Sequence, residues 1–371
     1  MRLRVDSSRP LSDQPGRGHN CWHQDLTPVL TVSPGEVFTI ETLDGFDGQL
    51  TRASRSEDVP SLALGRAHPL TGPIFVEGAE QGDLLEVELL EYESAEFGVS
   101  ACVPGLGLLS DLFPDPYVVH WELDTGFARS DALPSVAVPE SIFAGVLGVA
   151  PSHTQMEAMR RREEELAGRG GAVAASLPAD AMPPSAADGL RTIAPRETGG
   201  NLDVQDLVAG SRVLLPVSVT GALLSIGDLH YAQGGGEVCG TAIEIAGAVT
   251  VRLGLIRDPG STLRSPMYET PGRPARRCLA TTGIPLTQDG RNEPMDLALS
   301  ARNALIALID HLVATCGFEP EAAYVLASVA ADLELAQVVN APNPVVTALL
   351  PLEIFEGAHP GRRGRRGNAR G

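Results

Sequence analysis

The sequence predicts a mainly β fold with helices added towards the C-terminus, which places it in the all-β sandwich or the α+β class. Forty glycines and 29 prolines among 371 residues favour an architecture rich in turns and strands over a helical bundle. Several segments alternate apolar and polar residues with the period of two that a half-buried strand requires. Sustained helical spacing of apolar residues begins only near residue 294, so helices are expected there as additions.

The strand-like segments form two groups, one before residue 125 and one after residue 213. In the first group, a tight GluGlnGlyAsp connection at 80–83 predicts that residues 72–92 form a strand pair. In the second group, the apolar runs LeuLeuProValSerVal and AlaLeuLeuSerIle predict buried strands. The expected strands lie within residues 28–50, 72–92, 117–123, 214–219, 222–226 and 243–255.

Two helices are expected near the C-terminus. Residues 294–316 carry apolar side chains at helical spacing, with Pro294 suited to the first turn and Gly317 to the end of the helix. Residues 320–338 predict a second helix that begins at Pro320.

The composition also divides the chain. An Arg–Glu-rich stretch predicts a short exposed helix that runs into a segment rich in Gly, Ala and Pro, and together they predict a flexible insertion. We expect one compact catalytic unit made of these parts. They are a β-rich N-terminal part (1–151), the insertion (152–190), a β-rich part with most of the polar motifs (191–290), a helical part (291–358) and a disordered basic tail (359–371).

Charge and cysteine content limit the class of protein. The net charge of −19 argues against nucleic acid and against an anionic membrane surface as partners. Five scattered cysteines without a CxxC pair predict neither a disulfide framework nor a thiolate zinc site. The N-terminus lacks an apolar signal core and no apolar run approaches the length of a membrane span, so a cytoplasmic protein is expected.

Residues 199–244 combine carboxylates, an imidazole and many glycines with apolar, strand-like runs. Asp228 and His230 follow one of these runs two residues apart, so on an extended chain both side chains point to the same side. Carboxylate and imidazole groups beside Gly227 and the triple glycine 234–236 are suited to a metal site or a general-base site. A turn alone would need the glycines but not this collection of polar groups.

Other polar segments carry weaker signals. His19 and His23 lie in a loop-like stretch and could ligate a metal only in a favourable local conformation. Asp44 before a glycine, and His68 in a Pro- and Gly-rich loop, are more typical of turn and loop structure. The sequence has no GxSxG, SxxK, HExxH or P-loop motif, and Cys239 is better explained as a small buried residue than as a nucleophile.

Long stretches of the chain resemble the acetamidase/formamidase family of amide hydrolases, in order and over nearly the whole length. Only residues 152–190 and the basic tail lie outside the resemblance. The stretches are HNCWHQDLTP (19–28), SPGEVFTIETLDGFDGQL (33–50), HPLTGPIFVEGAEQGDLLEVEL (68–89), PGLGLL (104–109), FAGVLGVAP (143–151), PRETGGNLDVQDL (195–207), GALLSIGDLHYAQGGGEVCGTAIE (221–244), DLALSARNALIALIDHLV (296–313) and AYVLASVAADLELAQVVNAPNPVVTALLP (323–351).

The resemblance implies hydrolysis of short aliphatic amides to a carboxylate and ammonia by an enzyme with a β-sandwich core and added α+β parts. It also implies a homodimer or larger homo-oligomer and a divalent metal, zinc before calcium. By the same resemblance, Asp203, Asp228, His230 and Glu237 are the candidate metal ligands. Glu237 is the first candidate for the general base with Asp44 behind it, and Asn201 is the candidate oxyanion donor.

One position departs from the family pattern. The family usually has QGDGE where this chain has GlnGlyGlyGlyGlu, so Gly235 replaces an aspartate. If that aspartate were a ligand or base, the chain would be altered in activity or would be an inactive member that binds an amide or a metal. If the aspartate only shaped the turn, Gly235 would be harmless. A third alternative, a metal-free mechanism with Cys239 as nucleophile, also stays open at this point.

Overall fold

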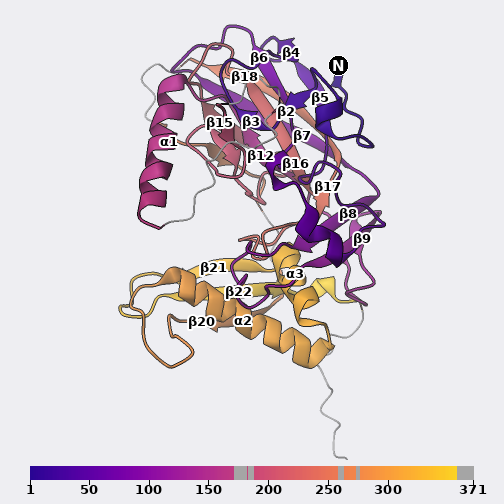
Figure 1. The fold of residues 1–371 in the computed structure, drawn as a ribbon, viewed down its shortest axis with the longest axis vertical. Helices are drawn as coiled ribbons and strands as arrows, with labels where there is room; N and C mark the ends of the chain where they lie inside the picture. The colour runs from indigo at the N-terminus through magenta and orange to yellow at the C-terminus, as the bar shows by residue number, and fades with distance from the viewer. Residues whose placement is uncertain (171–181, 183–187, 258–262, 273–275, 357–371) are drawn as a thin grey trace, which may run out of the picture.

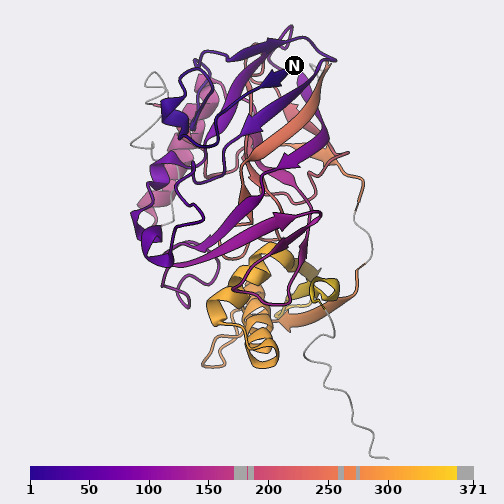
Figure 2. The ribbon, with the colours of Figure 1, turned by 90° about the vertical axis from the view of Figure 1, so that its right-hand side faces the viewer.

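The protein is mainly β, as the sequence predicts, with α2 and α3 near the C-terminus (Figure 1). The computed structural model describes residues 1–170, 182, 188–257, 263–272 and 276–356. Two large sheets contribute side chains to one continuous apolar core, and a smaller unit of helices and strands lies at one end of them (Figures 1 and 2).

The six-stranded sheet is built around two long antiparallel strands, β7 and β18. In β5 the sequence VFTIET alternates buried and more exposed residues, which is the pattern of a strand with one face in the core. In sheet order the strands are β1 (Arg2–Leu3), β5 (Val37–Thr42), β18 (Gly247–Ile256), β7 (Leu84–Ser94), β15 (Arg212–Pro216) and β19 (Met267–Glu269). Strands from both β-rich parts of the chain therefore alternate within one sheet.

The eleven-stranded sheet holds the motif-bearing strand β16 near its centre. All seven residues of β16 are buried, because β12, β17 and β6 all pair with it. The main path runs β11 (Val138–Pro139), β10 (Phe127–Arg129), β9 (Tyr117–Asp124), β8 (Phe97–Cys102), β17 (Glu244–Ile245), β16 (Leu224–His230), β12 (Phe143–Gly148) and β14 (Gly199–Asn201). Off this path, β6 (Leu70–Val76) pairs with β16, β2 (Gly18–His19) and β4 (Leu30–Val32).

The strand pair expected at residues 72–92 is wrong in its pairing. Both strands exist, but β6 belongs to the eleven-stranded sheet and β7 to the six-stranded one. The residues between them carry the chain from one sheet to the other, so the GluGlnGlyAsp turn does not close a hairpin. The local turn signal was correct, whereas the partners of each strand lie far away in the sequence.

The C-terminal part contains a sheet as well as helices. β20 (Cys278–Gly283), β22 (Val345–Pro351) and β21 (Asp332–Gln337) form an antiparallel sheet on which α2 (Leu297–Cys316) packs (Figure 1).

The second helix expected at 320–338 is therefore too long. α3 (Pro320–Ala330) begins at Pro320 as predicted but ends eight residues early, because residues 332–337 pair with β22. The first expected helix begins at Leu297 with Asp296 as its N-cap, so Pro294 lies outside it, and Gly317 ends it in the left-handed conformation.

The helix expected in the insertion is confirmed as α1 (His153–Gly168). Its first turn is closed by a capping box between Ser152 and Gln155. Met156 and Met159 on its buried face contact a small core that includes Trp22 and Leu190, from the strands β3 (Cys21–Trp22) and β13 (Leu190–Arg191). Residues 171–181 and 183–187 of the expected flexible insertion, and the basic tail, lie outside the described residues.

Among the described residues, α2 is the one helix long and apolar enough to cross a membrane by length and composition. The expectation that no apolar run approaches this length was thus too strict. One face of α2, with Leu305, Leu308 and Leu312, is buried against the C-terminal sheet and α3. Core helices of globular proteins pass the same test of length and composition, so α2 is weak evidence for a membrane.

Candidate active site

Strand pairing brings an imidazole and two carboxylates together at the end of β16. Asp228 and His230 lie two residues apart on this strand, and Glu244 on β17 is directly opposite His230. The His230 Nε2 atom lies 3.4 Å from Asp228 Oδ2 and 3.3 Å from Glu244 Oε2. The expectation that Asp228 and His230 share one side is confirmed, and Glu244 joins them through a pairing that the sequence did not reveal.

Asp203 and Glu237 reach the same place from two loops. Asp203 follows β14, and its backbone N–H donates to the Gly145 carbonyl on β12. Glu237 lies in the loop after β16 and faces the same cavity. We call these five residues the carboxylate–imidazole cluster: Asp203, Asp228, His230, Glu237 and Glu244.

Two glycines allow the cluster to close. A Cβ atom at Gly145 would lie 2.7 Å from His230 Cε1 and 2.8 Å from both Asp203 Oδ1 and Asp228 Oδ2. A Cβ atom at Gly45 would overlap Asp228 Oδ1 and lie 3.0 Å from Glu244 Oε2. Backbone without a side chain is therefore required on two sides of the cluster.

Three members of the cluster have the left-handed backbone conformation that L-residues rarely adopt. The φ angles are 47° at Asp203, 56° at Asp228 and 43° at Glu237. Each such residue costs about 1–3 kcal/mol, and such residues gather at active and ligand-binding sites. The packing of the surrounding strands and loops holds these carboxylates in place despite that cost.

The four carboxylates of the cluster form one wall of a cavity of about 510 Å³. Other walls are largely apolar. They include Phe46, Leu64, Val103, Leu106 and Ile193, together with the polar residues His68, Arg191 and Asn201. A cavity of this kind, mostly apolar with a few converging polar groups, is typical of a small-molecule site.

Burial and mutual charge set the protonation of the cluster. Burial opposes ionisation of Asp228, but the charges of His68 and His230 outweigh it and lower the Asp228 pKa below its usual range. Burial likewise opposes a charge on His230, yet Glu244 and Asp228 raise the pKa of this imidazole well above its ordinary value.

The other three carboxyl groups hold protons more tightly than usual. Burial and then the charge of Asp203 raise the pKa of Glu237 well above its ordinary value. Burial also raises the pKa of Glu244 to about 7 and that of Asp203 to about 6. The cluster therefore contains carboxyl groups with pKa values below 7 and at or above 7. Such a range allows some groups to accept and others to donate protons near pH 7.

Six buried polar atoms of the site make no hydrogen bond within the part of the chain that the structure describes. They are His68 Nδ1, Arg191 Nε, Asn201 Oδ1, Asp203 Oδ1, His230 Nε2 and Glu244 Oε2. Buried polar atoms are nearly always paired in folded proteins, so their gathering here indicates a polar or cationic ligand.

The orientation of His230 suits a metal ligand. Gln233 Oε1, which can only accept, lies 2.8 Å from His230 Nδ1, so this nitrogen donates and the unprotonated Nε2 of the neutral ring would face the carboxylates. Gln233 Nε2 in turn donates to the Asp203 carbonyl. Metal-binding histidines are usually fixed by such a bond from the other ring nitrogen.

Two overlapping groups of side chains in the cluster have ligand atoms within 4.8 Å of one another. They are Asp203 with Asp228 and His230, and His230 with Glu237 and Glu244. All four ligands named from the sequence are thus close together. Oxygen ligands with an imidazole fit a divalent metal.

Asp44 and Asn201 lie in different surroundings from those expected. The Asp44 carboxylate accepts N–H bonds from Phe46 (2.9 Å) and Gly48 (3.1 and 3.2 Å), as in an Asx turn, and its neighbours Gly45 and Phe46 form the cavity wall. Asp44 thus positions the turn. The Asn201 amide donates one N–H to the Ile193 carbonyl at 3.1 Å, and its Oδ1 is buried without a hydrogen bond, so the side chain has an acceptor to offer a ligand. Its role as oxyanion donor stays a prediction.

His68 is a site residue that the sequence interpretation assigned to loop structure. Its Nε2 lies 3.9 Å from Asp228 Oδ2, and the ring forms part of the cavity wall. The Pro- and Gly-rich loop that surrounds His68 holds the ring at this wall. No local sequence signal distinguishes a histidine of a structural loop from a histidine of the site.

The departure at Gly235 does not remove a group from the cavity. The Gly235 N–H donates to Asp332 Oδ1 at 2.8 Å, and a Cβ atom there would lie 2.6 Å from Gln205 Nε2. Position 235 therefore faces the C-terminal unit rather than the carboxylate–imidazole cluster. Among the described residues, Cys239 is also outside the cavity wall, where Gly240 and Thr241 lie instead.

A buried cluster of carboxylates and an imidazole, at the wall of a small-molecule cavity on a mainly β scaffold, has the groups that an enzyme active site needs for acid–base chemistry. Residues 4–357 match the model of the acetamidase/formamidase family. The chain belongs to this family and is an amidohydrolase, which confirms the resemblance seen in the sequence.

Individual relatives support this assignment. The formamidase of Methylophilus methylotrophus is 32% identical over 380 residues, covering 95% of this chain and 93% of that protein. The acetamidase of Mycolicibacterium smegmatis is 34% identical over 358 residues, covering 87% of each. The solved structure of a gamma lactamase from Delftia acidovorans is 32% identical, with a TM-score of 0.90 over 96% of this chain and 93% of that one.

Proposed function

We propose that the protein hydrolyses formamide, acetamide or similar small amides to the carboxylate and ammonia in this cavity, with the aid of a divalent metal. The observation that supports this most directly is the convergence of carboxylate oxygens on His230, with ligand atoms within 4.8 Å of one another. Asp203, Asp228 and His230 would hold the metal, which leaves Glu237 and Glu244 for proton transfer. A bound divalent metal supplies Lewis acidity, which polarises a carbonyl group.

The remaining residues divide the work by protonation and position. Glu244, with a pKa of about 7, takes a proton from the attacking water while the water oxygen bonds to the carbonyl carbon of the amide. Glu237, whose pKa lies well above its ordinary value, delivers a proton to the nitrogen as the C–N bond breaks and ammonia leaves. Asn201 Oδ1 accepts an N–H of the substrate amide and orients it. The proton on Glu244 then returns to Glu237, whose carboxylate lies within 4.8 Å, so both groups regain their starting states. In this scheme Glu244, rather than Glu237, is the general base.

A second candidate substrate is a cyclic amide or an amide with a bulky apolar acyl group. The cavity of about 510 Å³, with walls that include Phe46, Val103 and Leu106, is larger than a formamide molecule requires. Cavities of about 300–1,000 Å³ usually hold much larger ligands. The likeness to the Delftia acidovorans gamma lactamase supports the same candidate.

One experiment separates these proposals. Ammonia release from formamide, acetamide and propionamide, and ring opening of a γ-lactam, are measured on protein of known metal content, before and after chelation. Turnover that disappears with chelator and returns with Zn²⁺ supports the metal-assisted mechanism. Turnover that persists in fully metal-free protein contradicts it, and loss on thiol alkylation alone would favour Cys239.

A catalytically inactive member that only binds an amide or a metal is the alternative to an active enzyme. Position 235 gave rise to that alternative, and it faces Gln205 and Asp332 rather than the cavity.

We also propose a cytoplasmic homodimer or larger homo-oligomer, on the family resemblance and the composition. Light scattering of the purified protein would measure its mass in solution.

A further inference from the structure

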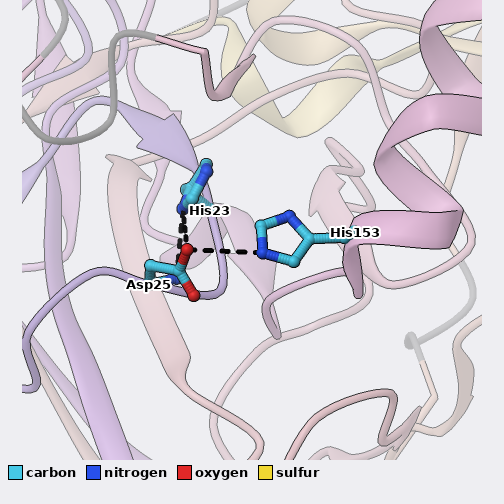
Figure 3. A group of neighbouring side chains, drawn as sticks. All are labelled: His23, Asp25 and His153. Atoms are coloured by element: carbon cyan, nitrogen blue, oxygen red, sulfur yellow. Dashed lines mark hydrogen bonds and ion pairs between the residues drawn. The ribbon is translucent and has the colours of Figure 1, made fainter.

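A second group of metal-binding side chains lies outside the active site, where α1 begins. The side chains of His23, Asp25 and His153 place one ligand atom each within 4.8 Å of the others. Figure 3 shows the His153 ring reaching from the first turn of α1 towards Asp25, with His23 above the same carboxylate. We call these three residues, with the neighbouring Asp188, the surface cluster.

One distance within the surface cluster is already that of two ligands around one ion, and the other is longer. The His153 Nε2 atom lies 3.3 Å from Asp25 Oδ2, and His23 Nδ1 lies 4.0 Å from the same oxygen. Ligands about 2.0–2.1 Å from a tetrahedral zinc ion are themselves roughly 3.3 Å apart. The two imidazole rings have centroids 5.5 Å apart and are inclined by 77°, so they converge on the carboxylate without stacking.

His23 is held in the tautomer that a metal needs. The backbone N–H of Asp25 donates to His23 Nδ1 at 3.0 Å, so this nitrogen carries the lone pair. A metal bound at Nδ1 would replace this hydrogen bond, so the Asp25 backbone would have to turn away. The opposite nitrogen, Nε2, lies 3.0 Å from Asp188 Oδ1. Histidines that bind zinc commonly donate the N–H of their other ring nitrogen to a carboxylate, which fixes the orientation of the ring. The His23 side chain is only 4% exposed, so its position is fixed by packing.

Charge balance also suits a divalent cation. The N-terminus of α1 carries partial positive charge and opposes a cation, whereas Asp25 and Asp188 supply two negative charges. The Asp25 and His153 side chains are 61% and 54% exposed, so an ion can reach them from solvent.

We propose that His23, Asp25 and His153 bind a divalent metal such as Zn²⁺ at a structural site, with Asp188 supporting His23. The site joins the loop after β3, the start of α1 and the approach to β13, and so fastens both described ends of the insertion to the body. Arg191 and Ile193, which follow Asp188 closely, form part of the active-site wall. The site is independent of the proposed catalytic metal.

The test measures zinc bound per chain by mass spectrometry of metals and by calorimetric titration of chelated, dialysed protein with Zn²⁺. His153→Ala and Asp25→Asn should each lose one zinc equivalent relative to wild type. Asp188→Asn should keep that equivalent but bind it about 10–100-fold more weakly. Thr154→Ala, an exposed neighbour on α1, is the matched control and should retain it.

A separate variant, His230→Ala, removes a residue of the carboxylate–imidazole cluster and tests the other metal site. Zinc should also raise the Tm of wild type and Thr154→Ala by more than it raises that of His153→Ala. His153→Ala should retain amide turnover within about twofold, since His153 is not among the residues that line the cavity. Unchanged zinc stoichiometry in both His153→Ala and Asp25→Asn would overturn the proposal and leave the surface cluster as a set of ion pairs.

Discussion

His230 Nε2 and Glu244 Oε2 lie 3.3 Å apart across the pairing of β16 with β17, and the Glu244 side chain is 5% exposed. The other oxygen of Glu244 accepts the Ala242 N–H at 2.9 Å, which fixes the carboxylate in one orientation. Glu244 therefore has one oxygen bound to the backbone and one directed at the imidazole. This division suits a group that must hold position while it exchanges a proton.

Glu244→Gln should lower kcat/KM for small amides by about 10²–10⁴, the usual contribution of one general acid or base. The amide oxygen of glutamine can still accept the Ala242 N–H, so the fold should be retained. Steady-state kinetics on protein with a wild-type circular dichroism spectrum checks this. Glu91→Gln, at an exposed position of β7, is the control. A Glu244→Gln enzyme within threefold of wild type would remove Glu244 from the mechanism.

Gly145→Ala should disrupt the carboxylate–imidazole cluster without adding or removing a polar group. The new methyl group would lie within 2.8 Å of atoms of His230, Asp203 and Asp228, so at least one of them must move. Overpacking of this kind costs about 1–3 kcal/mol of stability, and displacing reacting groups by about 1 Å can lower the rate about 10²-fold. Thermal unfolding and amide turnover measure the two effects.

Gly168→Ala is the matched control for this change, because no atom lies within 4 Å of the position at the end of α1. Gly168→Ala should leave amide turnover unchanged and raise the stability of the protein slightly, since alanine is the better helix former. Equal activity of both alanine variants would show that the cluster tolerates a shift, against the tight geometry inferred here.

Local sequence patterns were sufficient to predict most of the strands and part of the site. The spacing of Asp228 and His230 placed them on one side of a strand because side chains alternate with period two. Long-range pairing could not be predicted in the same way. Glu244 lies in the site because it pairs opposite His230. Residues 332–337 form β21 because they pair with β22, although the sequence predicted that they continue the preceding helix. Pairing energy from distant strands outweighs local propensity in such segments.

Individual loop residues were the least predictable part of the site. His68 and Asp44 both lie in turn-like sequence, yet His68 reaches the cavity whereas the Asp44 carboxylate is bound by its own turn. The fate of each side chain depends on which sheet edge the loop covers. That information comes from the assembled fold rather than from the nearby residues.

Gly235→Asp should not increase amide turnover, although it restores the residue usual in the family. Position 235 faces Gln205 and Asp332, and the new Cβ would lie 2.6 Å from Gln205 Nε2. The added carboxylate would also lie near the carboxylate of Asp332. We expect a stability loss of about 1–3 kcal/mol, measured by denaturant unfolding. Combining it with Asp332→Ala should recover part of the loss, whereas a tenfold gain in kcat would place position 235 in the active site.

Asp44 gives a test that depends on pH. Burial raises the pKa of its carboxyl from 3.8 to about 6, against the effect of the N–H bonds from Gly48 and Phe46. The folded chain therefore holds this proton more tightly than the unfolded chain between about pH 4 and pH 6. A raised carboxyl pKa means that the free energy of unfolding is highest below this range and falls as the pH rises through it.

Asp44→Asn should remove this pH dependence, because the amide oxygen still accepts the turn N–H bonds but does not ionise. The variant should gain stability over wild type between about pH 4 and pH 6, up to about 3 kcal/mol, and keep the gain above pH 6. Urea unfolding at each pH measures the difference, with the exposed Asp131→Asn as the baseline. Amide turnover should persist, since Asp44 positions a turn. A loss of about 10²-fold or more would instead return Asp44 to the role of base.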